Sequence, residues 1–338
     1  MRVTLIRASL VLSVLIAGCQ AAPTATSPGS TPTPAPAAST ATATPRPSPA
    51  AWRTLTDDEG NVLSLAEEPM RVVSLTPATT ELLFALGKGN KLVGRTDFDD
   101  YPPEAVELPA VASFTGVLIE QLVDLEPDLV IAGGNNFTPA GDITRLRELG
   151  LPVLVVYAAD LQGVLNDIEL VGRAVGAEQQ AQEIVGDINA RIEQVGRALQ
   201  DRQAPSVFYE IGFEPEIYGP APQSFVADMV RLAGGDPITT SDPVVFSISL
   251  EQLVTSDPEV IVLGDAAYGV CPESVAQREG WDSIRAVAEG NVRPVNDIIV
   301  TRPRPRIGEG IAALALAIHP DADIAPPADA GAELCSTE

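Results

Sequence analysis

After residue 52 the hydrophobic positions follow two alternating patterns, one typical of strands and one typical of helices. Short, mostly apolar runs lie at 71–75, 129–132 and 153–156, and each is followed by a run with helical spacing, at 80–86, 142–149 and 161–175. Short strands without polar alternation are typical of parallel sheets that are covered by helices on both faces. The pattern therefore predicts an α/β fold.

Residues 178–201 carry a single apolar stripe. Five aliphatic side chains recur at spacings of four, four, three and four residues, namely Ile184, Ile188, Ile192, Val195 and Leu199. This spacing is the period of one helix face. We therefore expect one long helix that joins two lobes. Beyond it the alternation resumes, with short β-like runs at 206–210, 260–263 and 298–301 and helical runs at 224–232 and 307–318.

A weak internal repeat supports two similar lobes. Residues 119–134 (IEQLVDLEPDLVIAGG) and 250–265 (LEQLVTSDPEVIVLGD) share identical residues at six of 16 positions, at a constant offset of 131. In both copies a short helix, a turn with proline between acids and a buried strand are expected in that order. The alternative is that two unrelated βα units converged on the same pattern.

The first 50 residues are of a different kind. Arg2 and Arg7 precede a short apolar run that ends in Leu-Ile-Ala-Gly-Cys, with Cys19 last. This resembles the lipobox of bacterial lipoproteins, which implies that the leader 1–18 is removed and Cys19 is acylated; an ordinary signal peptide is the alternative. Residues 20–50 hold eight of the 30 prolines and no large aliphatic or aromatic side chain, so they predict an extended tether.

Charge and residue counts exclude several function classes. The chain has 46 acidic and 21 basic residues and a net charge of −25, which argues against nucleic acid as a partner. His319 is the one histidine, so a Ser-His-Asp triad or a multi-histidine zinc site would depend on it alone. No phosphate-binding G-x-x-x-x-G-K-[ST] loop occurs.

Four stretches resemble one family, the substrate-binding proteins of ABC importers for iron chelates and vitamin B12. They are RVVSLTPATTELLFALG at 71–87, GRTDFDDYPPEA at 94–105, the repeated EQLV blocks, and TRPRPRIGEGIAALA at 301–315. The resemblance implies two Rossmann-like lobes with parallel sheets joined by one rigid interdomain helix, the class III periplasmic-binding-protein clamp. It also implies a ligand in the cleft, delivery to a permease dimer with a cytoplasmic ATPase, no cofactor of the protein's own, and no enzymatic activity.

The expected organisation follows from these patterns. It comprises a leader at 1–18, a lipidated cysteine and tether at 19–51, an N-terminal lobe at 52–176, an interdomain helix at 177–203, a C-terminal lobe at 204–320 and a tail at 321–338. In the family an acid at one place in each lobe meets arginines of the permease, and Glu120 and Glu251 match that place. Ordinary exposed helix glutamates are the alternative.

Ligand contacts are expected at strand ends and in the loops after them. The candidates are Thr76, Phe98, Phe114, Asn135, Asn136 and Phe137 in the first lobe, and Glu210, Tyr218, Phe246, Tyr268, Arg302, Arg304 and Arg306 in the second. Flat aromatic rings suit a corrin or porphyrin face, although packing within a lobe is the alternative for each. Phe98 and Phe114 match positions where relatives carry aromatic residues that contact ligand.

The three arginines of the RPRPR segment occupy alternate positions. If the segment is extended, Arg302, Arg304 and Arg306 point the same way and could clamp an anionic ligand. Pairing with the abundant acids is the alternative. Arg302 and Arg306 match the family segment, whereas Arg304 replaces its usual glycine.

The remaining chemistry points to a carrier. Tyr218 and Tyr268 are the possible axial ligands of a haem iron, and His319 is expected away from the cleft, so a pre-chelated metal fits better than a metal held by the protein.

Cys271 and Cys335 remain after Cys19 is lipidated, and an exported protein is expected to pair them; two free thiols are the alternative.

Together these observations predict a monomeric, extracytoplasmic solute-binding protein, held at the membrane by its lipid anchor only. Cobalamin is the favoured ligand, and a ferric siderophore or haem is the alternative. Two other classes stay open: an extracytoplasmic enzyme on a two-lobed α/β scaffold, and a structural lipoprotein of the cell surface.

Overall fold

The structure, a computed structural model, describes residues 51–328 and 334–335, apart from 114, 135–136 and 304. These residues belong to one compact unit, Pro49–Glu338. The expected leader, Cys19 and almost all of the tether lie outside the described residues. Within the described residues no helix is both long enough and apolar enough to cross a bilayer.

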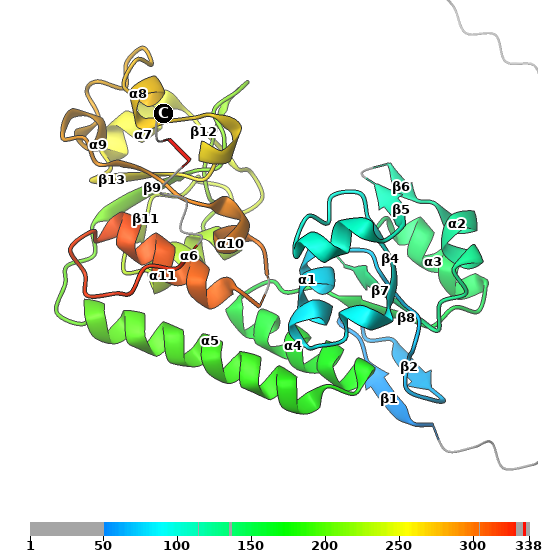
Figure 1. The fold of residues 1–338 in the computed structure, drawn as a ribbon. Coiled ribbons are helices and arrows are strands. Elements are labelled where there is room, and N and C mark those ends of the chain that lie inside the picture. Colours follow the sequence, from blue (N-terminus) through cyan, green and yellow to red (C-terminus); the bar gives the residue numbers. More distant parts are fainter. Residues whose placement is uncertain (1–50, 114, 135–136, 304, 329–333, 336–338) are drawn as a thin grey trace, which may run out of the picture. The chain divides into compact units, whose positions relative to one another are not determined.

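The first lobe is built on a six-stranded sheet in the order β6-β5-β4-β3-β7-β8 (Figure 1). All neighbours are parallel except β5 and β6, which are antiparallel. The strands are β3 (Val72–Ser74), β4 (Leu92–Thr96), β5 (Ala110–Ser113), β6 (Gly116–Val117), β7 (Leu129–Gly133) and β8 (Val153–Val156). The helical elements are α1 (Pro77–Ala85), η1 (Gly89–Lys91), η2 (Pro103–Glu107), α2 (Ile119–Asp124), α3 (Ala140–Glu148) and α4 (Leu161–Val175). An antiparallel hairpin of β1 (Arg53–Thr56) and β2 (Val62–Leu65) precedes them.

The second lobe has a four-stranded, fully parallel sheet in the order β11-β9-β13-β14. Its strands are β9 (Ser206–Glu210), β11 (Asp236–Pro237), β13 (Val260–Leu263) and β14 (Val292–Pro294), and β10 (Ile217–Tyr218) pairs separately with β12 (Ser247–Ile248). Its helical elements are α6 (Phe225–Leu232), α7 (Leu250–Ser256), η3 (Ala266–Tyr268), α8 (Pro272–Val275), α9 (Arg285–Ala288), α10 (Asp297–Thr301) and α11 (Ile307–Ile318).

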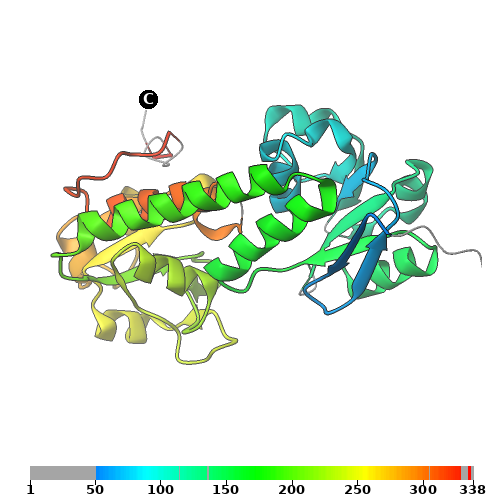
Figure 2. The same cartoon turned by 90° about the horizontal axis from the view of Figure 1, so that it is seen from below.

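One long helix, α5 (Glu178–Leu199), connects the two lobes. It packs against α4 of the first lobe and α11 of the second, as both views show (Figures 1 and 2). Ile188, Val195 and Leu199 of the predicted stripe are buried by these contacts. The turn between α4 and α5 depends on Gly176, whose φ of 68° is a left-handed conformation that glycine adopts without strain.

The predicted α/β class with parallel sheets is confirmed. One element was predicted wrongly: 298–301, expected as a β-like run, belongs to helix α10, and the strand beside β13 is the earlier Val292–Pro294. The side chain of Asn296 accepts a hydrogen bond from the Ile298 N–H and caps this helix. A four-residue apolar run does not by itself distinguish a strand from a buried helical turn.

The repeat seen in the sequence is also present in the backbone. Glu126 and Asp257, which are 131 residues apart, both adopt positive φ, at 45° and 42°. Asp128 accepts hydrogen bonds from the Met70 and Arg71 N–H groups beside β3, and its counterpart Glu259 accepts one from Ser206 N–H at the start of β9. The two helix–turn–strand units therefore match in their turns and in how their acids fasten the neighbouring strand.

Candidate functional site

A cavity of about 580 Å³ lies at the carboxyl ends of the first-lobe strands. Its floor follows the ends of β3, β7 and β8. Its walls come from the start of α1, the middle of α4, Phe225 at the start of α6, Thr301 at the end of α10, and Arg302, Pro303 and Pro305 beyond it. The lining is mostly apolar. The ends of parallel strands are where ligands bind in open α/β sheets.

Small residues leave the floor of the cavity open. A side chain at Gly133 would place its Cβ 2.7 Å from Thr76 Cγ2, and one at Gly134 would lie 3.0 Å from Tyr157 Cβ. Thr76 itself caps α1, because its hydroxyl accepts a hydrogen bond from Thr79 N–H at 3.0 Å. The first turn of α1 is thereby fixed against the floor, and Pro77 occupies the first helical position.

Aromatic side chains form much of the wall: Phe98, Phe137, Tyr157 and Phe225. Phe98 and Phe137 meet edge to face, with ring centroids 6.1 Å apart. The neighbouring buried Asp99 holds the Phe98 turn, since its carboxylate accepts hydrogen bonds from Thr80 Oγ1 and Thr96 N–H. Burial raises the pKa of Asp99, and those hydrogen bonds oppose the rise.

Arg302 is the basic side chain among the described residues that line the cavity. Its Nη1 is buried and has no hydrogen-bond partner. A buried, unpartnered guanidinium N–H loses its hydration without replacement. An anionic ligand group in the cavity would satisfy it.

Asp167, on α4, also lines the cavity. Burial raises the pKa of its carboxyl to about 8, and the hydrogen bond and charge of Asp58 add to the rise. Sequence reasoning missed this residue, since an acid in the middle of an amphipathic helix carries no signal of its own. It also missed Tyr157 and Phe225, although Tyr157 directly follows strand β8 and the strand-end rule could have found it.

Arg306 does not have the place expected for it in an extended arginine run, because its side chain is engaged by other residues. Its Nε donates to Glu81 Oε1 at 2.9 Å, and its guanidinium lies 3.9 Å from the centre of the Tyr101 ring. Residues 305–306 form a turn before α11 instead of continuing an extended segment. Arg302 and Arg306 therefore do not act as one row, and the buried pair joins α1 to the start of α11.

The second-lobe candidates lie apart from this cavity. Tyr218 is on β10, Phe246 is 43% exposed next to β12, and Tyr268 is 85% exposed at the end of η3. Glu210, at the end of β9, is fully buried and accepts two hydrogen bonds from Arg278, at 2.6 and 2.8 Å. The structure thus brings Thr76, Phe98, Phe137 and Arg302 together and leaves these four outside the group. Phe114, Asn135, Asn136 and Arg304 lie outside the described residues.

The two predicted docking acids occupy equivalent places. Glu120 and Glu251 are both exposed, each in the first turn of its helix, α2 and α7. Neither makes an ion pair within the described part of the chain. Each lobe therefore presents one free carboxylate at the same position of the repeat.

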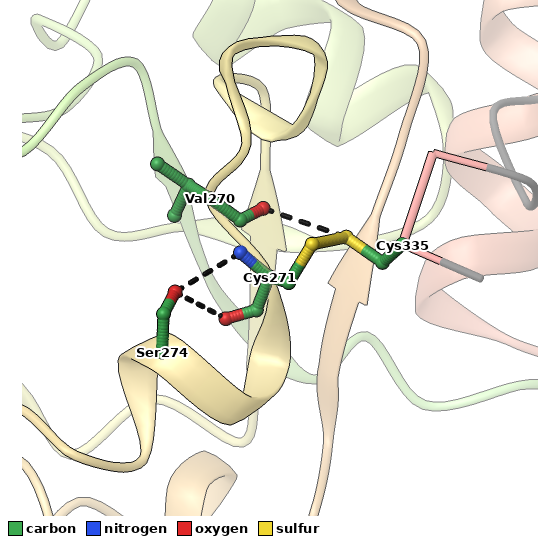
Figure 3. Close-up of a disulfide and its surroundings, with 4 residues drawn as sticks. All are labelled: Val270, Cys271, Ser274 and Cys335. Atoms are coloured by element: carbon green, nitrogen blue, oxygen red, sulfur yellow. Dashed lines mark hydrogen bonds between the residues drawn. A yellow bond between two sulfur atoms is a disulfide. The ribbon is translucent and has the colours of Figure 1, made fainter. Parts of the chain in front are cut away.

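Cys271 and Cys335 form a disulfide across a sequence separation of 64 residues (Figure 3). Cys271 precedes α8, where Ser274 Oγ hydrogen-bonds both its N–H and its carbonyl oxygen. The bond fastens the end of the tail to the loop after β13, and Cys335 packs against the apolar cluster of the second lobe.

No group of three or more His, Cys, Asp or Glu side chains that could hold a metal occurs among the described residues. His319 is buried at the far end of α11, where its Nε2 lies 3.0 Å from Gly234 O. This places it near the start of the second-lobe sheet, at the opposite end from the strand ends.

Known proteins resemble this chain over most of its length. An uncharacterized ABC transporter substrate-binding lipoprotein of Bacillus subtilis is 32% identical over 273 residues, which cover 79% of this chain and 86% of the relative. A cobalamin-binding protein of Halobacterium salinarum is 31% identical and covers 79% and 74%. The crystal structure of a periplasmic heme-binding protein from Pseudomonas aeruginosa superimposes with a TM-score of 0.67 at 25% identity, over 78% of this chain and 97% of that one.

The family described as periplasmic binding protein matches residues 72–297, which include both sheets and α5. The match confirms the resemblance found in the four sequence stretches and the class III fold that it implied. Members of this family are solute carriers of ABC importers. The sequence match, the mostly parallel first sheet, the parallel second sheet, the connecting helix and the strand-end cavity agree, and this chain belongs to the periplasmic binding protein family.

Proposed function

We propose that the protein captures a metal-tetrapyrrole or iron chelate outside the cytoplasm and delivers it to the permease of an ABC importer, with cobalamin as the first ligand. The cavity at the ends of β3, β7 and β8 carries the proposal. Its aromatic wall offers flat apolar contact, and Arg302 offers an unsatisfied cation. A large flat ligand with one anionic group matches that lining.

Cobalamin has one anionic phosphodiester, and its corrin ring bears neutral amide arms. One anion for one described cation is the reason to rank it first, and the cobalamin-binding relative supports the same order. Haem carries two carboxylates, and many ferric siderophores carry several. The heme-binding structural neighbour keeps haem as the second candidate.

The transport role has three further parts. The leader and an acylated Cys19 would hold the protein at the membrane by a lipid anchor, as the name of the Bacillus relative suggests for that protein. The folded part would act as a monomer without catalysis or a cofactor of its own. Glu120 and Glu251 would dock on a two-fold permease that is driven by a cytoplasmic ATPase, one carboxylate on each half.

Calorimetry tests the ligand assignment directly. The protein carries Cys19→Ser, which removes the acylation site and keeps every described residue, and is titrated with cyanocobalamin, haemin and several ferric siderophores. A Kd of about 1 μM or tighter for cyanocobalamin is expected. Binding of haemin or a siderophore alone would move the assignment to that ligand, and binding of none of them would overturn the proposal.

Arg302→Met tests the role of the cavity cation. Dicyanocobinamide keeps the corrin and its amides but lacks the phosphate, so it is the matched ligand. The substitution is expected to weaken cyanocobalamin about 10- to 100-fold, as for loss of a charged hydrogen bond, and to leave dicyanocobinamide unchanged. Arg197→Met, on the exposed face of α5, is the control variant. Equal losses for both ligands would show that Arg302 does not hold the phosphate.

A further inference from the structure

We propose that Glu81, Tyr101 and Arg306 form an interlobe clasp, which positions Arg302 at the cavity and has to open before the ligand can leave. Glu81 lies on α1 and Tyr101 precedes η2, both in the first lobe, whereas Arg306 begins α11 in the second. The inference rests on the proposed function, since it assumes that the ligand occupies the cavity. Glu81 and Arg306 are then positioning residues that act on the ligand through Arg302.

The contact between the lobes is a buried ion pair with two hydrogen bonds. Arg306 Nε donates to Glu81 Oε1 at 2.9 Å, and its Nη2 donates to Oε2 at 3.2 Å. The side chains of Glu81 and Arg306 are only 3% and 14% exposed. A forked pair of this kind fixes the orientation of its partners as well as their distance. The start of α11 is therefore held at one place on α1.

Tyr101 adds a second first-lobe contact to the same guanidinium. The guanidinium carbon of Arg306 lies 3.9 Å from the centre of the Tyr101 ring, within the range of a cation–π interaction. The helix that Arg306 begins packs against α5, α6 and β13. Arg306 therefore has its backbone in the second lobe and its side chain between two segments of the first.

The clasp borders the cavity from both lobes. Leu82, next to Glu81 on α1, lines the cavity, and so does Pro305, the residue before Arg306. As long as the clasp is closed, the first-lobe wall and the second-lobe wall of the cavity are held together at this edge.

The segment that carries Arg302 is held at both ends. At its second-lobe end Asp297, in the first turn of α10, accepts a hydrogen bond from the buried Tyr209 hydroxyl at 2.8 Å. At the other end Arg306 is fastened to α1. Pro303, whose ring fixes φ, directly follows Arg302 and limits the paths of the backbone between the two ends. If the clasp opens, only the second-lobe end stays fixed, and Arg302 moves with that lobe away from the cavity floor.

Losing one partner of the clasp should shift the protein toward an open form. An unpaired buried charge costs free energy in the conformation that buries it. When the lobes part, water can solvate the remaining charge, so the cost falls on the closed form alone. The closed population then drops in proportion to that cost.

Distances between spin labels in the ligand-free protein test the clasp itself. The labels replace Asp124 and Thr255 as cysteines, which are exposed and equivalent positions of the repeat on α2 and α7, with Cys19→Ser and the native disulfide kept. Arg306→Met should shift the distance distribution to longer values, and Arg306→Lys, which keeps the charge without the fork, should shift it less. An unchanged distribution in Arg306→Met would overturn the inference.

Two further variants keep this test decisive. Glu81→Gln retains the shape of the side chain without its charge, and should give the same shift if Arg306→Met folds poorly. Arg202→Gln is the matched control, because it breaks an ion pair with Asp321 that lies wholly outside the first lobe. A shift in Arg202→Gln as large as in Glu81→Gln would show that loss of any arginine pair loosens the protein, and would contradict the clasp.

The dissociation rate of labelled cyanocobalamin, chased with an excess of unlabelled ligand, tests the coupling to the cavity. Glu81→Gln and Arg306→Met should each raise this rate at least about tenfold, and together by no more than about the larger single effect, because both act through one contact. In the Glu81→Gln protein, Arg302→Met should weaken cyanocobalamin by less than about threefold, since Arg302 has already lost its place. A full and independent loss from Arg302→Met would show that the clasp does not position it.

The two measurements separate this inference from the proposed function. If the label distances lengthen as expected and no chelate binds, the proposed function fails and the clasp stands. If cyanocobalamin binds and neither the distances nor the dissociation rate change, the clasp is wrong and the function stands.

Discussion

Corresponding strands of the two lobes end in different surroundings. In the first lobe β7 runs into Gly133 and Gly134, and the space above them is the cavity. At the equivalent positions of the second lobe stand Gly264 and Asp265, and the buried side chains of Tyr209, Glu210 and Asp265 lie at this end of the sheet. One repeated backbone plan therefore gives an open strand end in one lobe and a filled one in the other, and the side chains alone make the difference.

The filled end is an ionic cluster. Glu210 is fully buried and paired with Arg278, whose guanidinium lies 3.8 Å from the Phe213 ring centre and 4.5 Å from that of Trp281. Asp265 is also buried, and burial together with the neighbouring Glu210 carboxylate raises the pKa of its carboxyl. The arginine of the second lobe thus has every interaction that Arg302 at the first-lobe cavity lacks. Arg278 is engaged within its own lobe, whereas Arg302 keeps an unpartnered Nη1 for the proposed ligand.

Replacing each of these two arginines with methionine should give the largest difference in the free energy of unfolding. Arg278→Met leaves the Glu210 carboxylate buried without its partner, and should lower the free energy of unfolding by about 3–5 kcal/mol. Arg302→Met removes no ion pair and should change it by less than about 0.5 kcal/mol. Urea denaturation followed by circular dichroism measures both. Equal effects would mean that the two strand ends do not differ in the way described.

The disulfide belongs to the filled lobe only. Cys271→Ser with Cys335→Ser opens a 64-residue loop, and the chain-entropy model gives a loss of about 4 kcal/mol, within a usual range of about 2–4. Reduction of the wild-type protein should produce the same loss. Hydrogen exchange should speed up in the loop after β13 and leave β3, β7 and β8 unchanged. Faster exchange in the first-lobe strands would contradict the separation of the two ends.

Asp167 on α4, beside the open strand end, and Asp265 at the filled one should each make the protein less stable as the pH rises. Burial raises the pKa of Asp167 to about 8 and that of Asp265 to about 7, with Glu210 adding to the latter. From the ordinary aspartate value of 3.8 up to these values the folded state holds a proton that the unfolded state has lost. The free energy of unfolding therefore falls by at most about 1.4 kcal/mol per pH unit for each group.

Thermal and urea unfolding between pH 5 and pH 9 should separate these contributions. Asp265→Asn should flatten the profile up to about pH 7, and Asp167→Asn should flatten it up to about pH 8, with Asp187→Asn as the unaffected control. A profile that rises with pH in the wild type would have the wrong sign for both groups.

The sequence predicted features that depend on local interactions better than features that depend on contacts between distant segments. Local patterns sufficed for β8, β9, α4 and α5, because apolar runs and helical stripes are written within one element. The strand-end rule selected Thr76, Phe98, Phe137 and Arg302 for the cavity region. The rule failed for Glu210, because whether a strand end is open depends on the residues that pack over it, here Arg278.

Contacts between distant segments were beyond reach. Arg306 and Glu81 are 225 residues apart, and nothing in the RPRPR segment shows that its last arginine pairs with α1. Asp58 influences the pKa of Asp167 only because the β1–β2 hairpin packs beside α4. Such pairs are set by tertiary packing, so a single sequence names the candidates but does not choose among them.

The smallest expected effect on the protein itself comes from the feature that the two lobes share. Glu120→Ala with Glu251→Ala removes two exposed carboxylates at matching positions, and should leave both ligand affinity and the free energy of unfolding within about 0.5 kcal/mol of wild type. Binding to the permease in lipid nanodiscs, measured by surface plasmon resonance, should weaken roughly tenfold or more at low salt, and less at high salt.

Single variants sharpen this last comparison. If the permease reads the repeat as two equivalent halves, Glu120→Ala and Glu251→Ala should lose similar amounts of affinity, and mainly in the association rate. Glu183→Ala with Asp187→Ala removes two exposed acids from α5 and serves as the control for net charge. A loss in that control as large as in the docking pair would mean that overall negative charge, and not the matched position of one acid on each lobe, is what the permease recognises.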